Sequence, residues 1–243
     1  MAFNKSRLRA LVGVYYDVQE VRISADHRIR KAGEHGLTED GVAALMDWVD
    51  TRMEKQETEL KTMVMREIRD EQIWTEWLVG VKGVGPCITG GLLAWVGYCE
   101  TFETVSKVWK FCGMDVKDGI APRRQRGVKL TFNPALRTLC WKAGESFVKQ
   151  GDGYRDLYLA EKTRLHGLYP EPAPYDPPRL KKDKSPLLRH TDGHLHAMAK
   201  RKVVKVFLSH YWQTARRMRD LPIREVYALE QLGHTTPIPV VMH

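Results

Sequence analysis

Long apolar runs are absent from this chain of 243 residues. A membrane-spanning helix needs about 20 consecutive apolar residues. The first residues, MAFNKSRLRALVG, carry charge too early for the apolar core of a secretory signal. We therefore expect a cytoplasmic protein, from a prokaryotic cell or encoded by a phage, with no membrane association.

Cysteine is scarce, and no two cysteines form a CxxC pair. The four, each surrounded by apolar residues, are Cys87, Cys99, Cys112 and Cys140. This setting favours buried thiols over a zinc site or disulfides. Histidine clusters once, at His190, His194 and His196 beside Asp192. Two of these histidines would lie on different sides of a helix, so we expect capping or phosphate contacts there, with no metal and no cofactor.

Catalytic signatures are also missing. No phosphate-binding loop appears, and no serine has a neighbouring pattern that would mark it as a nucleophile. The acidic residues between Glu39 and Glu76 fit the solvated face of a helical arm better than a two-metal nuclease centre. We expect a protein without catalytic activity.

Strand-like alternation is lacking, so the sequence predicts a mainly α fold. Apolar spacing predicts a helix from Lys5 to about Arg30, two glycines interrupt it, and Thr38 is placed to cap a second, long helix. The second helix has a coiled-coil seam with steps of three and four residues, namely Met46, Val49, Met53, Gln56, Leu60, Met63 and Glu67. Residues 1–76 are thus predicted to form a helical hairpin, which packs on itself, inside one domain, or on a second copy of the chain.

A helix-hairpin-helix element is predicted from Leu78 to Gly97, within a nucleic-acid-binding domain at 77–165. Gly83 and Gly85 would let the backbone approach a phosphate closely, and Pro86 suits the first turn of the second helix. Free N–H groups at that helix start, with Lys82 beside them, favour a phosphate ligand. A simple glycine-rich turn between packed helices is the alternative.

Positive charge exceeds negative charge in the chain as a whole. The formal net charge is +9 and the isoelectric point about 9.4, which indicates a polyanionic partner. A proline-rich basic linker is predicted at 166–192. Residues 193–243 are predicted to form a helix that starts at Gly193 and an irregular tail after it. The residues predicted to contact nucleic acid are Lys82, Gly83, Gly85, Lys107, Lys110, Arg123, Arg124, Arg126, Lys129, Asn133, Arg137, Lys142, Lys181, Lys182, Lys200, Arg201, Lys202 and Lys205.

Aromatic side chains interleave with these charges at Trp109, Phe111, Trp141 and Tyr154. Each could stack on an unpaired base, or fill the core as aromatic residues at helical spacing often do.

Three stretches between Trp77 and about Arg164 carry a resemblance: VKGVGPCITGGLLAWVGYCETFET, WKFCGM and NPALRTLCWKAGESF. This region resembles the C-terminal domain of bridge-RNA-guided insertion-sequence transposases. In that family a turn supplies a nucleophilic serine, and an N-terminal RuvC-like domain supplies acidic metal ligands. The corresponding stretch here, MDVKDGIAPRRQRG, has no serine, and the chain starts directly at the helical hairpin, so we expect no recombination chemistry.

The order of parts also resembles the Nop domain of box C/D ribonucleoproteins, and more closely the Tas proteins of tandem interspaced guide RNA systems. That resemblance implies a guide RNA, recognition of target double-stranded DNA by pairing, and a homodimer held through the hairpin. The resulting hypothesis is a noncatalytic guide-RNA-binding protein. The alternatives are a structure-specific DNA-binding protein or domesticated transposase fragment acting without RNA, and a metal-dependent nuclease or recombinase.

Overall fold

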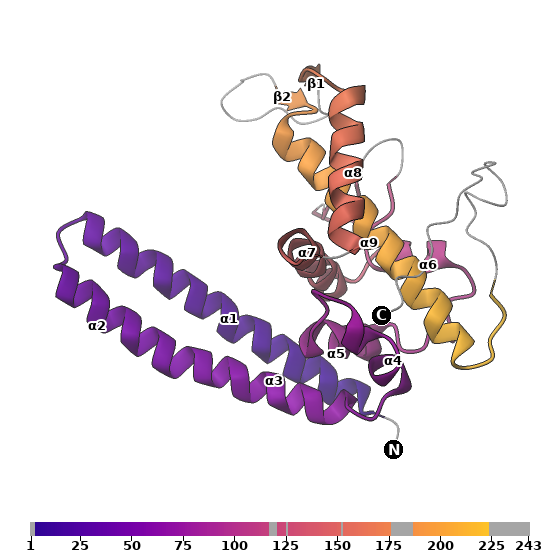
Figure 1. Ribbon diagram of the computed structural model, residues 1–243, viewed down its shortest axis with the longest axis horizontal. Helices are drawn as coiled ribbons and strands as arrows, with labels where there is room; N and C mark the ends of the chain where they lie inside the picture. Colours follow the sequence, from indigo (N-terminus) through magenta and orange to yellow (C-terminus); the bar gives the residue numbers. More distant parts are fainter. Residues whose placement is uncertain (1–2, 117–120, 125, 152, 176–186, 224–243) are drawn as a thin grey trace. The chain divides into compact units, whose positions relative to one another are not determined.

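Helices dominate the computed structural model, which describes residues 3–116, 121–124, 126–151, 153–175 and 187–223 (Figure 1). Within these residues the β structure is one antiparallel pair, β1 (Ala173–Tyr175) and β2 (Leu187–Arg189). The predicted mainly α fold is therefore confirmed. No helix in the described ranges is both long and apolar enough to cross a membrane.

Two compact units make up the chain. Residues up to 79 form the first together with 85–97, and residues 80–84 form the second together with those from 98 onward. This division differs from the sequence-based boundary at residue 76, because the helix at 86–95 groups with the hairpin.

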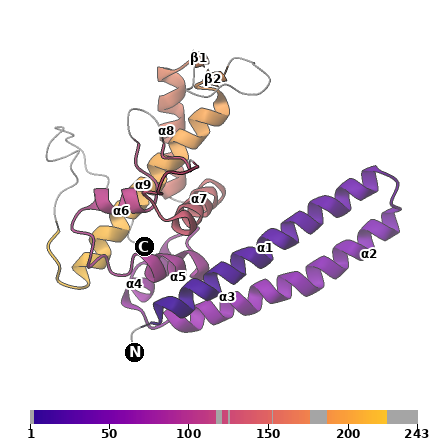
Figure 2. The same cartoon turned by 180° about the vertical axis from the view of Figure 1, so that it is seen from behind.

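The hairpin unit contains α1 (Lys5–Glu34), α2 (Glu39–Val49), the π turn η1 (Asp50–Glu54) and α3 (Lys55–Ile68), followed by α4 (Gln72–Thr75) and α5 (Pro86–Trp95). The short 3₁₀ turn η2 (Leu78–Gly80) spans the division at residue 79. Figures 1 and 2 show α1 antiparallel to the second arm. Thr38 caps α2 as predicted, since its Oγ1 accepts a hydrogen bond from Gly41 N at 3.2 Å.

The seam of the second arm differs from the prediction at two positions, where burial is shifted by one residue. Val49 is buried as expected, but Gln56 and Met63 are exposed, and their neighbours Glu57 and Val64 are buried instead. The π turn at residues 50–54 explains the shift, because i→i+5 hydrogen bonding inserts an extra residue and rotates the following face.

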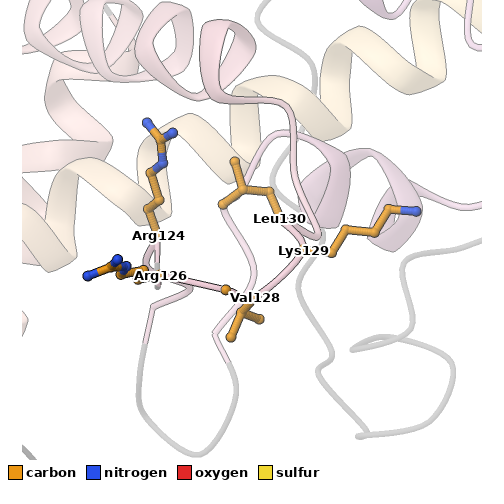
Figure 3. A pocket seen from close by; sticks show the side chains of 6 residues that line it. Arg124, Arg126, Val128, Lys129 and Leu130 are labelled. Atoms are coloured by element: carbon orange, nitrogen blue, oxygen red, sulfur yellow. The ribbon is translucent and has the colours of Figure 1, made fainter.

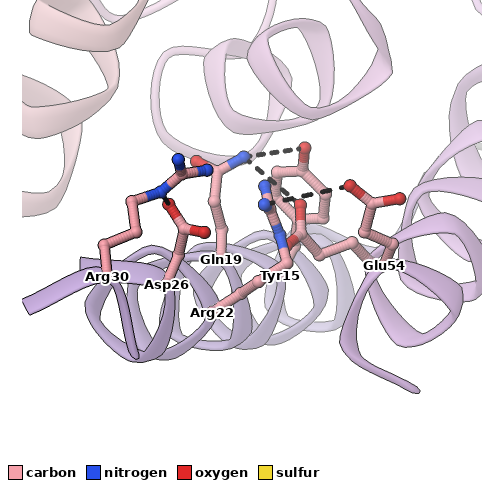
Figure 4. Close-up of polar contacts among 7 residues, drawn as sticks. Tyr15, Gln19, Arg22, Asp26, Arg30 and Glu54 are labelled. Carbon is pink, nitrogen blue, oxygen red and sulfur yellow. Dashed lines mark hydrogen bonds and ion pairs between the residues drawn. The ribbon is translucent and has the colours of Figure 1, made fainter. Parts of the chain in front are cut away.

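Polar contacts join the two arms at Glu57, which was not a predicted seam position, and at Glu67, which was. Glu57 of α3 accepts hydrogen bonds from Arg22 Nε at 2.5 Å and from Gln19 Nε2 at 3.5 Å. Figure 4 labels the two donors, Gln19 and Arg22, among the polar contacts of the hairpin. Glu67, the other predicted polar seam residue, is half-buried and pairs with Arg7 at 3.1 Å. These directional contacts fix the register of the arms, as polar seam residues do in coiled coils.

Helix α5 is a small-residue helix packed against α1 and α3. Residues 86–94 are all buried. A Cβ on Gly90 would lie 2.7 Å from Val64 Cγ1, so glycine here allows the helices to approach closely. Pro86 occupies the first turn, as predicted.

The second unit contains α6 (Val105–Phe111), α7 (Pro134–Lys149), α8 (Gly153–Leu168) and α9 (Asp192–Arg217). Helices α8 and α9 lie side by side and antiparallel (Figures 1 and 2). Phe147 and Tyr154 stack at 4.7 Å between ring centroids, and both contact Phe207 edge-on. Two hydrogen bonds, the buried one between Tyr154 and His210 at 2.8 Å and the partly buried one between Tyr158 and His196 at 2.7 Å, align α8 with α9.

Candidate nucleic-acid interface

Helix α9 carries four of the predicted contact residues, and the structure divides them into two pairs. Lys200 forms an ion pair with Glu145 of α7, and Lys202 forms one with Glu161 of α8 at 2.9 Å. These two charges are compensated within the protein. Arg201 and Lys205 have no carboxylate within ion-pair distance in the described part of the chain.

Arg201 and Lys205 lie one turn apart on α9 and therefore share a face. Arg201 Nη1 donates to the carbonyl of Gly113 at 3.3 Å, and Lys205 Nζ lies 4.1 Å from the centroid of the Trp109 ring. Trp109 Nε1 in turn donates to the Lys205 carbonyl at 2.9 Å. Helix α6 and the turn after it thus hold both cations in place.

A third cation, Arg137 of α7, joins this group, which we call the cation cluster (Arg137, Arg201 and Lys205). Desolvation lowers the pKa of Arg201, and repulsion from Arg137 lowers it further. Desolvation and repulsion from Arg201 likewise lower the pKa of Lys205. Partly desolvated like charges are unfavourable unless an anion compensates them. The charge of Asp115 opposes this lowering of the pKa at both residues, and positive charge remains in excess at the cluster.

Arg137 also connects the cation cluster to the arginine-rich loop at 121–130. Its Nη1 donates to the carbonyl of Pro122, and its guanidinium lies 4.7 Å from the centroid of the Phe132 ring. Both contacts lie at the ends of the loop, so Arg137 ties the loop to α7.

The loop itself exposes its charges around an open hollow of about 710 Å³. Figure 3 shows Arg124 and Arg126 on one side of the hollow and Lys129 on the other, with Val128 and Leu130 between them. Arg123 is exposed as well. Exposed guanidiniums beside a fixed cation cluster extend the surface on which a phosphate backbone can lie.

Other predicted contact residues have different roles or surroundings. Asn133 caps α7 by accepting from Leu136 N at 3.1 Å. Lys107 pairs with Glu103 at 2.6 Å, Lys110 is exposed on α6, and Lys142 is half-buried on α7. Lys181 and Lys182 lie outside the described residues.

The two glycines of the turn differ from each other in conformation. Gly83 has φ of +89°, and a Cβ there would lie 3.2 Å from Ser146 Oγ and 3.3 Å from Phe147 Cδ1. Close packing on α7 therefore explains this glycine. Gly85 has an ordinary extended conformation, and a Cβ added to it would meet no atom within 4 Å. Lys82 is exposed.

Of the aromatic candidates, Trp141 remains accessible for stacking, with 57% of its surface exposed. It lies one turn from Arg137 on α7, and Lys200 lies 5.5 Å from its ring centroid. Tyr154 is core, Trp109 supports Lys205, and Phe111 packs on Phe102 at 5.4 Å. A base stacked on Trp141 would lie near the cation cluster.

The histidines are engaged in local contacts. The His190 ring stacks on Tyr169 at 3.7 Å between centroids, and the backbone N–H of His190 donates to His194 Nδ1 at 3.0 Å. His196 is bound to Tyr158. In the described ranges no group of three or more His, Cys, Asp or Glu side chains is placed to hold a metal ion.

One residue of the interface was missed by sequence reasoning. Asp115 follows α6, and its charge acts on both Arg201 and Lys205. Its Oδ1 is buried and accepts no hydrogen bond from the described residues. The signal available in the sequence was that an acidic residue stands in a strongly basic stretch.

Comparison with protein-family models, curated proteins and solved structures finds no match to this chain. The functional argument therefore rests on the geometry of the interface.

Proposed function

We propose that this protein is a noncatalytic guide-RNA-binding protein that engages target double-stranded DNA through RNA pairing. The observation that carries the proposal is the cation cluster, Arg137, Arg201 and Lys205, which is partly desolvated and forms no ion pair with a carboxylate of the described residues. A phosphate backbone supplies the compensating charge, and the arginine-rich loop extends the contact.

The choice of RNA over DNA follows from two further features. Trp141 offers an accessible ring near the cluster, which suits unpaired bases better than a closed duplex. The resemblance of the helical hairpin and basic module to guide-RNA-binding proteins points the same way. Sequence would then be read by the guide, as in RNA-guided systems generally.

The test measures binding of the full chain to structured RNA and to duplex DNA by fluorescence anisotropy over a salt series. We expect RNA to copurify with the chain and structured RNA to bind more tightly than duplex. Replacing both Arg201 and Lys205 by alanine should weaken RNA binding at least about tenfold and reduce the salt dependence. Lys202→Ala is the matched control, because that lysine is already paired with Glu161 and should have little effect.

Failure to copurify RNA, together with no preference for structured RNA over duplex, would overturn the proposal. Tight binding of junction DNA by nuclease-treated protein would instead support the structure-specific DNA-binding alternative.

We also propose that the chain forms a homodimer through its hairpin. Apolar side chains on both arms are exposed, at 49% for Val14, 57% for Val21, 48% for Leu45 and 58% for Trp48. A second copy would cover such surface, which is costly to leave in water. Light scattering should show a dimer that Trp48→Glu dissociates, whereas a monomeric wild-type chain would contradict the proposal.

A further inference from the structure

Trp141 of α7 is an exposed indole ring in charged surroundings. More than half of its surface is exposed, and no other large apolar side chain of α7, all of whose residues the structure describes, is exposed. Arg137 lies one turn before it and Glu145 one turn after it. A protein partner usually covers a contiguous apolar patch. A single ring among charges suits instead a small planar ligand that carries negative charge.

Lys200 of α9 supports the Trp141 ring from one side. Its Nζ lies over one face of the ring, 5.5 Å from the centroid, and the ion pair with Glu145 holds it there. Gly144 lets the two helices approach closely, because a Cβ on it would lie 3.0 Å from Val204 Cγ2. A base can therefore stack only on the opposite face, and a ring that is already supported loses little freedom on binding.

Arg137, one turn from the ring, lies beside Arg201. A Cβ on Gly113 would lie 3.1 Å from Arg137 Cδ, and the Gly113 carbonyl accepts a hydrogen bond from Arg201 Nη1 at 3.3 Å. Both arginines therefore flank Gly113. A guanidinium carries five N–H donors, and the bonds to Pro122 and Gly113 each use one of them. The other N–H groups can donate to phosphate oxygens.

We propose that Trp141 stacks on one unpaired base of the bound RNA while Arg137 and Arg201 contact the phosphate of the same nucleotide. The inference rests on the proposed RNA-binding function and names the part of the RNA that this site takes, an unpaired nucleotide of a loop or bulge. The span is suitable, since Trp141 and Arg137 are separated by one helical turn of about 5.4 Å and a base is separated from its phosphate by a single sugar.

A base inside a duplex cannot use this site, because its two faces are covered by the neighbouring base pairs. Every base has a flat face, so stacking on Trp141 does not depend on which base is present. The site would therefore recognise an unpaired position in the RNA and leave the guide sequence free to vary.

The experiment compares two RNA probes of equal length and charge, a single strand of mixed sequence and an abasic strand that keeps the sugars and phosphates. We expect the wild-type chain to bind the single strand about tenfold more tightly, the size of stacking one base on an aromatic ring. Trp141→Ala should remove most of this ratio, and Trp141→Phe, which keeps a smaller ring, should retain part of it. Leu159→Ala is the matched control, since it removes an exposed apolar side chain from α8 of the same unit and should leave the ratio unchanged.

Photocrosslinking locates the stacked base directly. A single strand that contains 5-iodouridine should crosslink to the tryptic peptide 138–142, which contains Trp141. A crosslink confined to other peptides would contradict the inference. Tighter binding of a single DNA strand of the same sequence would assign the site to DNA and contradict it as well.

Circular dichroism and Tm establish that each variant is folded. Equal binding of the single strand and the abasic strand by the wild-type chain, or an unchanged ratio in Trp141→Ala, would overturn the inference even where RNA binding itself is confirmed. Absence of RNA binding by the wild-type chain would overturn the proposed function too.

Discussion

Arg22 of α1 and Glu57 of α3 form an ion pair across the hairpin seam, with 2.5 Å between Nε and Oε1. The side chains are 23% and 11% exposed, respectively. Because both are largely withdrawn from water, removing one leaves the other poorly compensated. The pair is therefore expected to contribute measurably to the stability of the hairpin.

Glu57→Ala should destabilise the protein by about 2 kcal/mol, because Arg22 loses its main partner in a partly buried position. Urea unfolding monitored by circular dichroism measures the change. Glu59→Ala, at an exposed position of the same helix, should have little effect. Replacing the pair together, Arg22→Met with Glu57→Leu, should recover stability relative to Glu57→Ala, and failure to do so would contradict the argument.

Gly90→Ala should destabilise the hairpin unit by about 1–3 kcal/mol through overpacking against Val64, despite the higher helix propensity of alanine. Gly13→Ala is the matched control in α1, where nothing lies within 4 Å of the added Cβ. There the same substitution should stabilise by up to about 1 kcal/mol. Opposite shifts in Tm are expected, and shifts of the same sign would show that propensity outweighs packing.

Stability should fall on mild acidification because of His196. Desolvation lowers the pKa of His196, and the charges of Lys200 and Lys162 lower it further, whereas the charge of Glu145 raises it. A depressed pKa favours the neutral ring in the folded chain. The contribution of His196 to the free energy of unfolding is therefore complete above pH about 6.5 and is lost as the pH falls through the folded-state pKa.

Tm should therefore decrease from pH 7.5 to pH 5, and His196→Gln should reduce the slope of Tm against pH. Some slope should remain, since desolvation also lowers the pKa of His194. His27→Gln, at an exposed position of α1, is the control and should leave the slope as it is in wild type. An unchanged slope in His196→Gln would refute this assignment.

Arg137→Ala should loosen the arginine-rich loop, because it removes the hydrogen bond to Pro122 and the contact with Phe132. Limited trypsin digestion should cut after Arg123, Arg124 or Arg126 several-fold faster than in wild type. Thr138→Ala, the next and exposed residue of α7, is the control. Equal cleavage rates in the two variants would show that the loop is held by other contacts.

Local signals in the sequence predicted the helical fold and the Thr38 cap well. The predicted seam of the second arm was wrong at Gln56 and Met63 because a π turn has no clear sequence signature, and one inserted residue moved burial from Gln56 to Glu57. Sequence reasoning thus failed where a regular period was interrupted.

The basic residues of α9 show a different limit. Spacing alone places Arg201 and Lys205 on one face, but Lys200 and Lys202 are neutralised by Glu145 and Glu161, which come from other helices. Which charges remain for a ligand is decided by tertiary contacts. The sequence predicted a basic helix but did not show which of its basic residues form ion pairs within the protein and which do not.

The burial of Cys87, Cys99, Cys112 and Cys140 has a practical consequence. Burial raises the pKa of the Cys87 thiol to about 12 and raises those of Cys99 and Cys112 as well. Thiolates are the reactive form, so maleimide dyes should label the native chain very slowly. A cysteine introduced at the exposed position of Lys129 would then be a unique attachment point, and single-molecule spectroscopy could follow the loop without first removing the natural cysteines.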